Sequence, residues 1–506
     1  MRQNANLYAE LHASFERNAA RVAIETTAGE RHTYADVERE TARYAGFLCA
    51  QGLQRGDRVA VQVEKSPQSL FLYLGCLRAG FVYLPLNSAY RPAELSYFLG
   101  DAEPAVMVSS PALYSEVVAL TERQRLPAKV FTLDADGTGS LSAGLASASP
   151  YADVAVAQPD DLAVIIYTSG TTGRSKGAML THRNLTSNAK TLVRYWGFSA
   201  DDILLHALPI FHVHGLFVAN HCALLSGAKI LWHARFDPRA VIADLWRATV
   251  MMGVPTYYTR LLAEETFNRA GCAGVRLFIS GSAPLLPDTF RSFEARTGHS
   301  ILERYGMSET GMIASNPLHG ERRPGTVGFP LPGIAVRVTD SADRSVAAAQ
   351  TGGIQVRGEN VFSGYWRNPE KTREEFSADG WFRTGDVGVF DADGYLSIVG
   401  RAKDLIITGG YNVYPKEIEL AIDGLTGILE SAVVGIPHPD YGEAVTAAVV
   451  LRSEAMALSE SDVIAQLKAQ LAGYKVPKRV YFVDALPRNA MGKVQKNLLR
   501  DQLAQR

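Results

Sequence analysis

A loop rich in glycine and hydroxyl groups, YTSGTTGRSKG at 167–177, is the part of this sequence best suited to chemistry. Its three glycines let the backbone turn sharply and aim N–H groups at an anion. Five Ser and Thr hydroxyls can donate further hydrogen bonds, and Arg174 and Lys176 add positive charge. The loop is not a Walker A motif, because that motif places Lys and then Ser or Thr directly after its second glycine. The composition predicts a loop that wraps the β- and γ-phosphates of a nucleotide, the alternative being a surface loop without a ligand.

The elements around this loop indicate an α/β fold. Apolar, strand-like runs alternate with amphipathic helical segments over roughly the first 400 residues, which indicates parallel-type sheets covered by helices. Ser66 is expected to cap a helix that begins at Pro67 and ends before Gly80. We expect the loop to lie between a buried strand at 162–168 and a helix from Thr181. The other expected strands are at 57–64, 81–86, 105–110, 228–232 and 275–281.

The character of the sequence changes after about Tyr395. A helix at 415–425, strands at 431–437 and 444–451, a helix at 459–473 and a strand at 479–487 predict a small α+β lobe. We therefore predict a large N-terminal domain at 1–400 and a smaller, mobile C-terminal domain at 401–506.

Composition excludes several classes of protein. With 506 residues, of which 47% are hydrophobic and 20% charged, the chain is neither disordered nor low in complexity. A formal net charge of -1 gives no global footprint for nucleic acid or an anionic membrane. From 465 to 506, however, there are nine Lys and Arg residues and two Asp and Glu residues, so this end of the chain is basic.

The pattern of the chain is typical of a cytoplasmic protein. Leu7, Leu11 and Phe15 recur at helical spacing, and no apolar signal core or membrane span is expected. The four cysteines lie far apart in sequence and are predicted to be free thiols, as in a reducing compartment. They are Cys49, Cys76, Cys222 and Cys272.

Five further motifs accompany the loop, in a fixed order: SGSAP at 280–284, ERYGMSET at 303–310, WFRTGD at 381–386, GRAKD at 400–404 and PRNAMGK at 487–493. Together the six motifs resemble those of the acyl-adenylate-forming enzymes, which include acyl-CoA synthetases, peptide-synthetase adenylation domains and luciferases. The resemblance covers essentially the whole chain. It implies that a carboxylate attacks the α-phosphate of ATP, and that a thiol then displaces AMP from the acyl adenylate. ATP and CoA would be substrates, with Mg²⁺ as cofactor.

The resemblance also implies roles for individual residues. Lys493 would stabilise charge developing between the carboxylate and the α-phosphate, assisted by Thr168 and by Ser308, which stands where the family usually has Thr. Glu309 would bind Mg²⁺. The nucleotide would contact Thr168, Ser169, Gly170, Thr171, Thr172, Gly173, Lys176, Gly281, Ser282, Ala283, Glu303, Arg304, Tyr305, Gly306, Ser308, Asp386 and Arg401.

Other residues match the parts of the family that move. Lys403 matches the hinge about which the smaller domain rotates between adenylation and thioester formation. Gly409, Gly410 and Tyr411 match a loop that lines the pantetheine tunnel in relatives. His212 matches an aromatic gate between the substrate and thiol sites, the alternative being a satisfied core histidine.

Within the family, LPIFHVHGL at 208–216 and GVPTYYTR at 253–260 resemble malonyl-CoA synthetases. A second substrate carboxylate requires a cation, because burying it unpaired is costly. Arg291 matches the position with that role in the subgroup, and Arg235 is a second candidate. Met307 is expected to contact the malonate methylene, so that its bulk sets whether methylmalonate is also accepted.

Alternatives remain open from the sequence. The same chemistry would act on a monocarboxylate such as acetate or a medium-chain acid, or would load a separate carrier protein. A non-catalytic nucleotide sensor would require loss of Lys493 or Glu309, and both are present. Lys493 also resembles lysines that acetylation switches off in relatives, so a lysine acetyltransferase and a deacetylase are candidate partners. A monomer and a homodimer fit the sequence equally.

Overall fold

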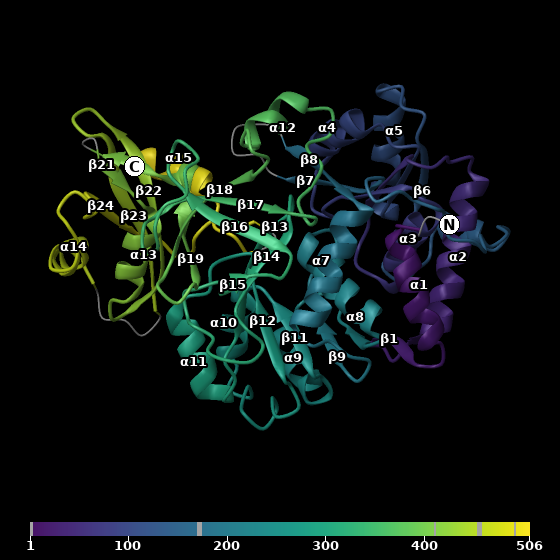
Figure 1. Cartoon of the computed structure of the whole chain (residues 1–506), viewed down its shortest axis with the longest axis horizontal. Coiled ribbons are helices and arrows are strands. Elements are labelled where there is room, and N and C mark those ends of the chain that lie inside the picture. The colour runs from purple at the N-terminus through teal and green to yellow at the C-terminus, as the bar shows by residue number, and fades with distance from the viewer. Residues whose placement is uncertain (1–3, 169–174, 409–410, 453–457, 490–491, 506) are drawn as a thin grey trace.

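The computed structural model describes residues 4–168, 175–408, 411–452, 458–489 and 492–505. Figure 1 shows an elongated molecule, with the N-terminal helices at one end and the C-terminal lobe at the other. Some residues predicted to bind ligands lie outside the described residues, namely Ser169, Gly170, Thr171, Thr172, Gly173, Gly409 and Gly410.

A six-stranded sheet carries the start of the predicted phosphate loop. Its order is β6-β5-β3-β4-β7-β8, parallel except for the last pair. Helices α4 (Pro92–Ala102) and α5 (Tyr114–Arg123) cover one face, while α2 (Tyr34–Ala50) and α3 (Pro67–Ala79) lie against the other. The strands are β3 (Arg58–Gln62), β4 (Val82–Pro85), β5 (Val106–Ser109), β6 (Lys129–Thr132), β7 (Leu162–Thr168) and β8 (Lys176–Thr181), and a short helix α6 (Ser140–Leu145) follows β6.

One expectation about this sheet is wrong. The loop was expected to lead from a strand into a helix, but β8 intervenes and pairs antiparallel with β7. Ala178 and Leu180 are buried in β8, so the short apolar run before Thr181 forms an edge strand rather than part of the loop. The loop therefore closes a β-hairpin, and helix α7 (His182–Tyr195) begins only after it.

A nine-stranded sheet forms the centre of the body, in the order β15-β14-β13-β12-β11-β9-β10-β1-β2. The strands from β13 to β1 are parallel, and the strands at both ends are antiparallel. Its strands are β1 (Val22–Thr26), β2 (Arg31–Thr33), β9 (Ile203–His206), β10 (Lys229–Trp232), β11 (Val250–Gly253), β12 (Leu277–Ser280), β13 (Leu302–Met307), β14 (Gly311–Ser315) and β15 (Phe329–Pro330).

Alternate residues of these strands face different layers, as the two-residue period of a strand requires. Leu204 of β9 packs in the main core, whereas Leu205 packs against helices on the opposite face. Those helices are α9 (Pro238–Asp244), α10 (Pro255–Leu262) and α11 (Pro287–Thr297), with a 3₁₀ turn at Leu245–Arg247.

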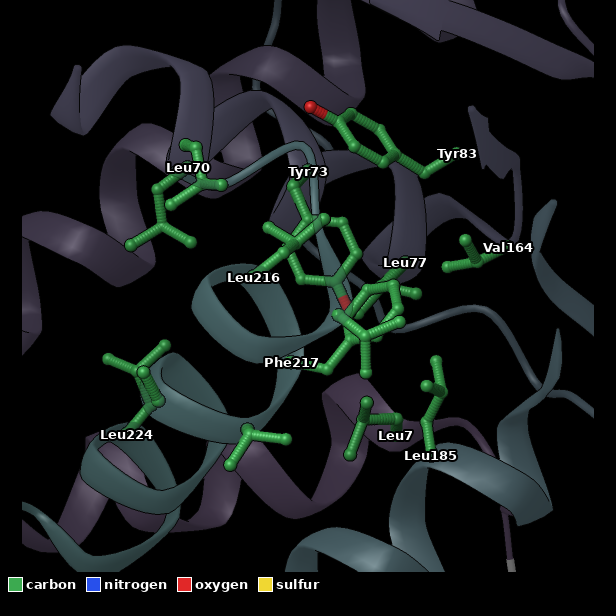
Figure 2. Packing of buried hydrophobic residues seen from close by; sticks show 14 of the residues in the cluster. Leu7, Leu70, Tyr73, Leu77, Tyr83, Val164, Leu185, Leu216, Phe217 and Leu224 are labelled. Carbon is green, nitrogen blue, oxygen red and sulfur yellow. The ribbon is translucent and has the colours of Figure 1, made fainter. Parts of the chain in front are cut away.

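The main core joins elements that are distant in sequence. Figure 2 shows Leu7 of α1 (Leu7–Arg17), Tyr73 of α3 and Phe217 gathered in one cluster. Phe217 belongs to a π-helical segment, His214–Ala219, which continues into α8 (Asn220–Ser226). The predicted N-terminal amphipathic helix is confirmed, as are the Ser66 cap and the helix that starts at Pro67.

Two smaller sheets complete the chain. An antiparallel sheet, in the order β16-β17-β18-β19, precedes the C-terminal lobe and is followed by a 3₁₀ turn at Ala402–Asp404. Its elements are β16 (Ile334–Thr339), β17 (Gly352–Gly358), α12 (Pro369–Glu375), β18 (Phe382–Phe390) and β19 (Leu396–Arg401).

The C-terminal lobe is α+β, as predicted. Helices α13 and α14 pack on one face of its sheet and α15 on the other. Helix α14 is shorter than the predicted 459–473, because the chain turns at Ala469 to reach β24. The elements are β20 (Ile406–Thr408), β21 (Tyr411–Val413), α13 (Pro415–Asp423), β22 (Ile428–His438), β23 (Gly442–Leu451), α14 (Glu460–Lys468), β24 (Arg479–Phe482) and α15 (Lys496–Ala504).

Among the described residues, no helix combines the length and apolarity needed to cross a membrane. The four cysteines are free thiols, and Cys76, Cys222 and Cys272 are buried.

Candidate active site

The candidate site lies where several strands end. Thr168 closes β7, Ser280 closes β12, and Tyr305 and Met307 stand at the end of β13. In open α/β sheets, ligands bind beyond the carboxyl ends of parallel strands. Strands β12 and β13 are neighbours in the nine-stranded sheet, and a contact between Thr168 and Glu309 brings the end of β7, from the six-stranded sheet, to the same region.

Asp386 is the centre of a polar cluster formed by two sheets. The Tyr305 hydroxyl donates a 2.5 Å hydrogen bond to its Oδ2, and Arg401 Nε lies 2.7 Å from its Oδ1. Asp386 and Arg401 are directly paired residues of β18 and β19. Burial raises the pKa of Tyr305, and the charge of Asp386 adds to the increase. Tyr305 therefore stays a neutral donor, and the cluster can hold the hydroxyls of a ribose.

Glu309 occupies a buried position beside Thr168, where the predicted phosphate loop begins. It is 6% exposed, and its Oε1 accepts hydrogen bonds from Thr168 Oγ1 at 3.3 Å and from the Tyr365 hydroxyl at 3.2 Å. Burial raises the pKa of the Glu309 carboxyl. A buried carboxylate of this kind gains most from a bound cation, since the cation replaces lost hydration.

These residues fit Mg²⁺ as the predicted cofactor. Magnesium is usually held by one or two carboxylates together with substrate phosphates and water. Glu309 supplies one such carboxylate beside Thr168, at the start of the phosphate loop. Lys176, at the other end of that loop, lies 4.6 Å from the centre of the Tyr365 ring and 3.6 Å from Glu375.

Arg304 is the most unusual group in the site. It is 3% exposed, and its Nε and Nη2 atoms have no hydrogen-bond partner among the described residues. Burial lowers the pKa of Arg304 to about 9. A Cβ on Gly281 would lie 2.4 Å from Arg304 Cζ, so only glycine lets the guanidinium pack there. A buried cation without a partner is costly, which indicates that a ligand supplies the anion.

Two histidines stand beside Arg304. His214 is buried, its Nδ1 lies 3.3 Å from Ser282 Oγ, and its Nε2 has no partner in the described chain. The His212 Nδ1 accepts a 3.3 Å hydrogen bond from the backbone N–H of His214. Burial, together with the charges of Arg304 and Lys493, lowers the pKa of His212 to about 4, and burial lowers the pKa of His214 as well. Both imidazoles are therefore neutral at physiological pH.

Lys493 reaches this region from the C-terminal lobe. Its side chain is exposed, yet the surrounding protein lowers its pKa to about 8, chiefly by desolvation and then through the charge of Arg401. The charges of Asp386 and Lys403 also act on it. The preceding Gly492 abuts the N-terminal body, where an added Cβ would lie 2.9 Å from Thr256 Oγ1. The lobe thus presents Lys493 to the Asp386 cluster.

Other predicted residues lie in varied surroundings. Arg291 is exposed on α11 and forms an ion pair with Asp288 at 2.5 Å. Arg235 lines a cavity of about 300 Å³ together with Phe211 and Tyr257. Tyr411 is exposed and stacks on Tyr474. The half-buried residues at or just after the end of β13 are Gly306, Met307 and Ser308, and Glu303 is buried within that strand. Ala283 lies in the loop after β12, and Lys403 is exposed in the 3₁₀ turn.

Sequence reasoning missed three residues of the site. Tyr365 contacts Glu309 from a segment outside all six motifs, so no local pattern marks it. His214 lies inside the LPIFHVHGL run, where the neighbouring His212 drew the prediction. Thr256 meets Gly492 across the chain, a contact that no spacing in the sequence reveals.

Comparison with known proteins agrees with this geometry. Residues 11–366 match the model of the AMP-binding enzyme family, and residues 417–493 match that of the AMP-binding enzyme C-terminal domain. A feruloyl-CoA synthase of Amycolatopsis sp is 37% identical, with 93% of this chain and 94% of that protein covered. A malonate–CoA ligase of Arabidopsis thaliana is 35% identical, with 92% and 80% covered.

The solved structures include MatB from Rhodopseudomonas palustris, 52% identical over 99% of both chains. Its ATP-bound structure superposes with a TM-score of 0.97, and its apo structure with 0.86. The arrangement of the parts is therefore closer to the ATP-bound form. The family model covers well over half of the chain, and the chain belongs to the AMP-binding enzyme family.

Proposed function

We propose that the chain is an ATP-dependent malonate–CoA ligase, which converts malonate, ATP and CoA to malonyl-CoA, AMP and pyrophosphate through malonyl adenylate. Methylmalonate is proposed as a second substrate. The observation that carries the choice of malonate is Arg304, a buried guanidinium without a protein partner in the described residues. A substrate with a second carboxylate supplies the missing anion.

In the first half-reaction a malonate oxygen attacks the α-phosphorus of ATP, and the bond to the leaving pyrophosphate breaks. This step needs charge neutralisation and positioning more than covalent help. Asp386 and Arg401 hold the ribose, while Lys493 provides an ammonium at the reacting centre. With a pKa of about 8, that ammonium is largely protonated at pH 7. Glu309 and Thr168 would hold Mg²⁺, which when bound offsets the charge of the phosphates.

In the second half-reaction the CoA sulfur attacks the acyl carbonyl carbon, AMP leaves, and the thiol proton goes to solvent. The cavity of about 300 Å³ adjoins Phe211, next to His212, and is proposed as the route of the pantetheine arm. Its lining combines aromatic rings with polar side chains such as Asn87 and Ser88, which suits a chain that carries two amides. Arg235 also lines this cavity, so we propose that it contacts either CoA or malonate. Lys403 is proposed as the hinge, and Tyr411, with Gly409 and Gly410, as tunnel residues.

The distal carboxylate is assigned to Arg304 in preference to Arg291. Arg291 is exposed and already paired with Asp288, so its charge is compensated without substrate. Arg304 is buried and packs beside Gly281, and its charge acts on both histidines. A carboxylate bound there restores an ion pair, which offsets the cost of burying either charge alone.

A panel of acids tests the proposal. CoA-dependent release of AMP and pyrophosphate is measured with malonate, methylmalonate, acetate, octanoate and ferulate, together with separate Arg304→Met and Arg291→Met variants. We expect malonate to be preferred and Arg304→Met to abolish that preference. Equal turnover of acetate and malonate would support the monocarboxylate alternative, and activity with a carrier thiol but not CoA would support carrier loading.

We propose that the protein acts in the cytoplasm. We also propose that acetylation of Lys493 switches it off, because acetylation removes the ammonium charge. Mass spectrometry of the Lys493 peptide tests the modification, and light scattering decides between a monomer and a homodimer.

A further inference from the structure

The turn that carries Lys493 is closed by a compact set of hydrogen bonds. The Asn489 N–H donates to the Lys493 carbonyl at 2.9 Å, and the Gly492 N–H donates to the Asn489 carbonyl at 2.9 Å. An isolated bridge pairs Arg488 with Val494 at the base of the turn. The backbone of Lys493 is therefore held by Asn489 and lies next to the bridge between Arg488 and Val494.

The peptide unit just before Lys493 is held at both of its polar ends. Its N–H, from Lys493, donates to Asn489 Oδ1 at 3.0 Å. Its carbonyl, from Gly492, accepts a hydrogen bond from Nη1 of Arg488. Because a peptide unit is planar, fixing both groups fixes the plane from which the Lys493 Cα–Cβ bond projects.

Arg488 also ties this peptide to the sheet of the lobe. Its Nη2 forms an ion pair with Glu430 of β22, the eleven-residue strand that runs through the sheet. Both side chains of the pair are about three-quarters buried, with 27% and 24% exposed. The guanidinium fork can direct two hydrogen bonds at fixed angles, which an ammonium cannot do.

We propose that Arg488, braced by Glu430, is the positioning residue for Lys493: it aims the ammonium at the α-phosphate when the lobe is in the adenylating arrangement. The inference rests on the proposed role of Lys493 in adenylation. Arg488 itself touches no substrate. Its loss leaves this peptide unit held only at the Lys493 N–H, so the direction of the ammonium is less well fixed. A misplacement of about 1 Å costs about 10²-fold in rate.

The lobe offers a matched control. Arg479 of β24 forms an ion pair with Glu460 at 3.1 Å, in the same domain. Arg479→Met removes one arginine and one ion pair, as Arg488→Met does, without touching the turn. Glu430→Gln removes the charge that pairs with Arg488 but keeps Arg488 itself. Arg488→Lys keeps the positive charge but loses the planar guanidinium that directs two hydrogen bonds.

The test measures two half-reactions in the full-length enzyme. Pyrophosphate release without CoA reports adenylation, and thioester formation from supplied malonyl adenylate reports the second step. We expect Arg488→Met to slow adenylation by about 10- to 100-fold and to leave thioester formation within about twofold. Glu430→Gln and Arg488→Lys should give intermediate losses, and Arg479→Met none. Labelling of Lys493 by a small amine reagent, followed by peptide mass spectrometry, should change in Arg488→Met alone.

The outcomes separate this inference from the proposed function. If Lys493→Ala leaves adenylation intact, the role of Lys493 fails and the inference fails with it. If Lys493→Ala abolishes adenylation while Arg488→Met does not, only the inference is overturned. It is also overturned if both half-reactions fall together in Arg488→Met, or if Arg479→Met gives the same loss. Thermal unfolding of each variant identifies loss of fold, and Arg488→Lys then supplies the decisive comparison.

Discussion

Arg401 Nε lies 2.7 Å from Asp386 Oδ1, across the antiparallel pair β18–β19. This ion pair joins the carboxylate that we propose to bind the ribose to the last residue before the turn that carries Lys403. The pair therefore connects nucleotide binding with the segment proposed to act as a hinge.

Asp386→Asn should weaken ATP binding. The amide retains the shape of the side chain but loses the negative charge. That charge pairs with Arg401 and strengthens the hydrogen bond from the Tyr305 hydroxyl. A hydrogen bond to a charged group contributes about 1.5–3 kcal/mol, so the KM for ATP should rise by about 10- to 100-fold. Steady-state kinetics at saturating malonate measures this. An unchanged KM for ATP, with a lower kcat alone, would contradict a role in ribose binding.

Adenylation should slow as pH rises through the pKa of Lys493. Its value of about 8 lies below the usual value for lysine, so the ammonium is present below pH 8 and is lost above it. The kcat/KM for adenylation reports the free enzyme and should fall about tenfold for each pH unit above this value. Lys493→Arg keeps its charge throughout, so its slower reaction should show no such fall. A flat profile for the wild-type enzyme argues against Lys493 as the acting cation.

Glu303→Gln should stabilise the protein at alkaline pH. The carboxyl is buried, its Oε1 accepts a 3.0 Å hydrogen bond from the Leu285 N–H, and its Oε2 has no partner among the described residues. Burial raises its pKa to about 7 from 4.5.

The direction of this effect follows from proton linkage. Between pH 4.5 and 7 the folded state holds a proton that the unfolded state has released, so stability declines as pH rises. The loss amounts to about 3 kcal/mol above pH 7. Glu303→Gln removes it, and its melting temperature should depend less on pH across this window. The prediction fails if wild type and variant show parallel pH dependence.

Gly492→Ala should impair adenylation selectively. Gly492 has φ of +72°, and an added Cβ would lie 2.9 Å from Thr256 Oγ1, so the turn must move away from the body. Adenylation should fall at least about tenfold, since misplacement of a positioned group has effects of this size. Thioester formation should remain.

Two further variants separate the clash from backbone strain. Gly380→Ala places alanine at φ of +80° with nothing within 4 Å, so it carries the strain alone. Thr256→Ala, combined with Gly492→Ala, removes the colliding Oγ1 and should restore much of the rate. Equal losses in Gly380→Ala and Gly492→Ala would mean that contact with Thr256 has no part in the effect.

Motif order predicted much of the fold and site, because residues such as Asp386, Arg401 and Lys493 lie in compact local patterns. The structure brings these three within electrostatic reach, as the resemblance implied. Strand β8 was missed because a short edge strand has too few residues to show a period. From the sequence, Arg304 is predicted to contact the nucleotide only because it lies in the same motif as other predicted nucleotide contacts. Its packing against Gly281 and lack of a protein partner emerge only when β12 and β13 lie side by side.

The most direct test of malonate as the substrate is the ratio of kcat/KM for malonate to that for acetate, in wild type and in Arg304→Met. The buried guanidinium predicts a ratio of about 10 to 100 in wild type, since a charge-assisted pair contributes about 1.5–3 kcal/mol. In Arg304→Met the ratio should fall towards one, while ATP binding stays intact. Equal turnover of the two acids in wild type, or an undiminished preference for malonate in Arg304→Met, would contradict the account.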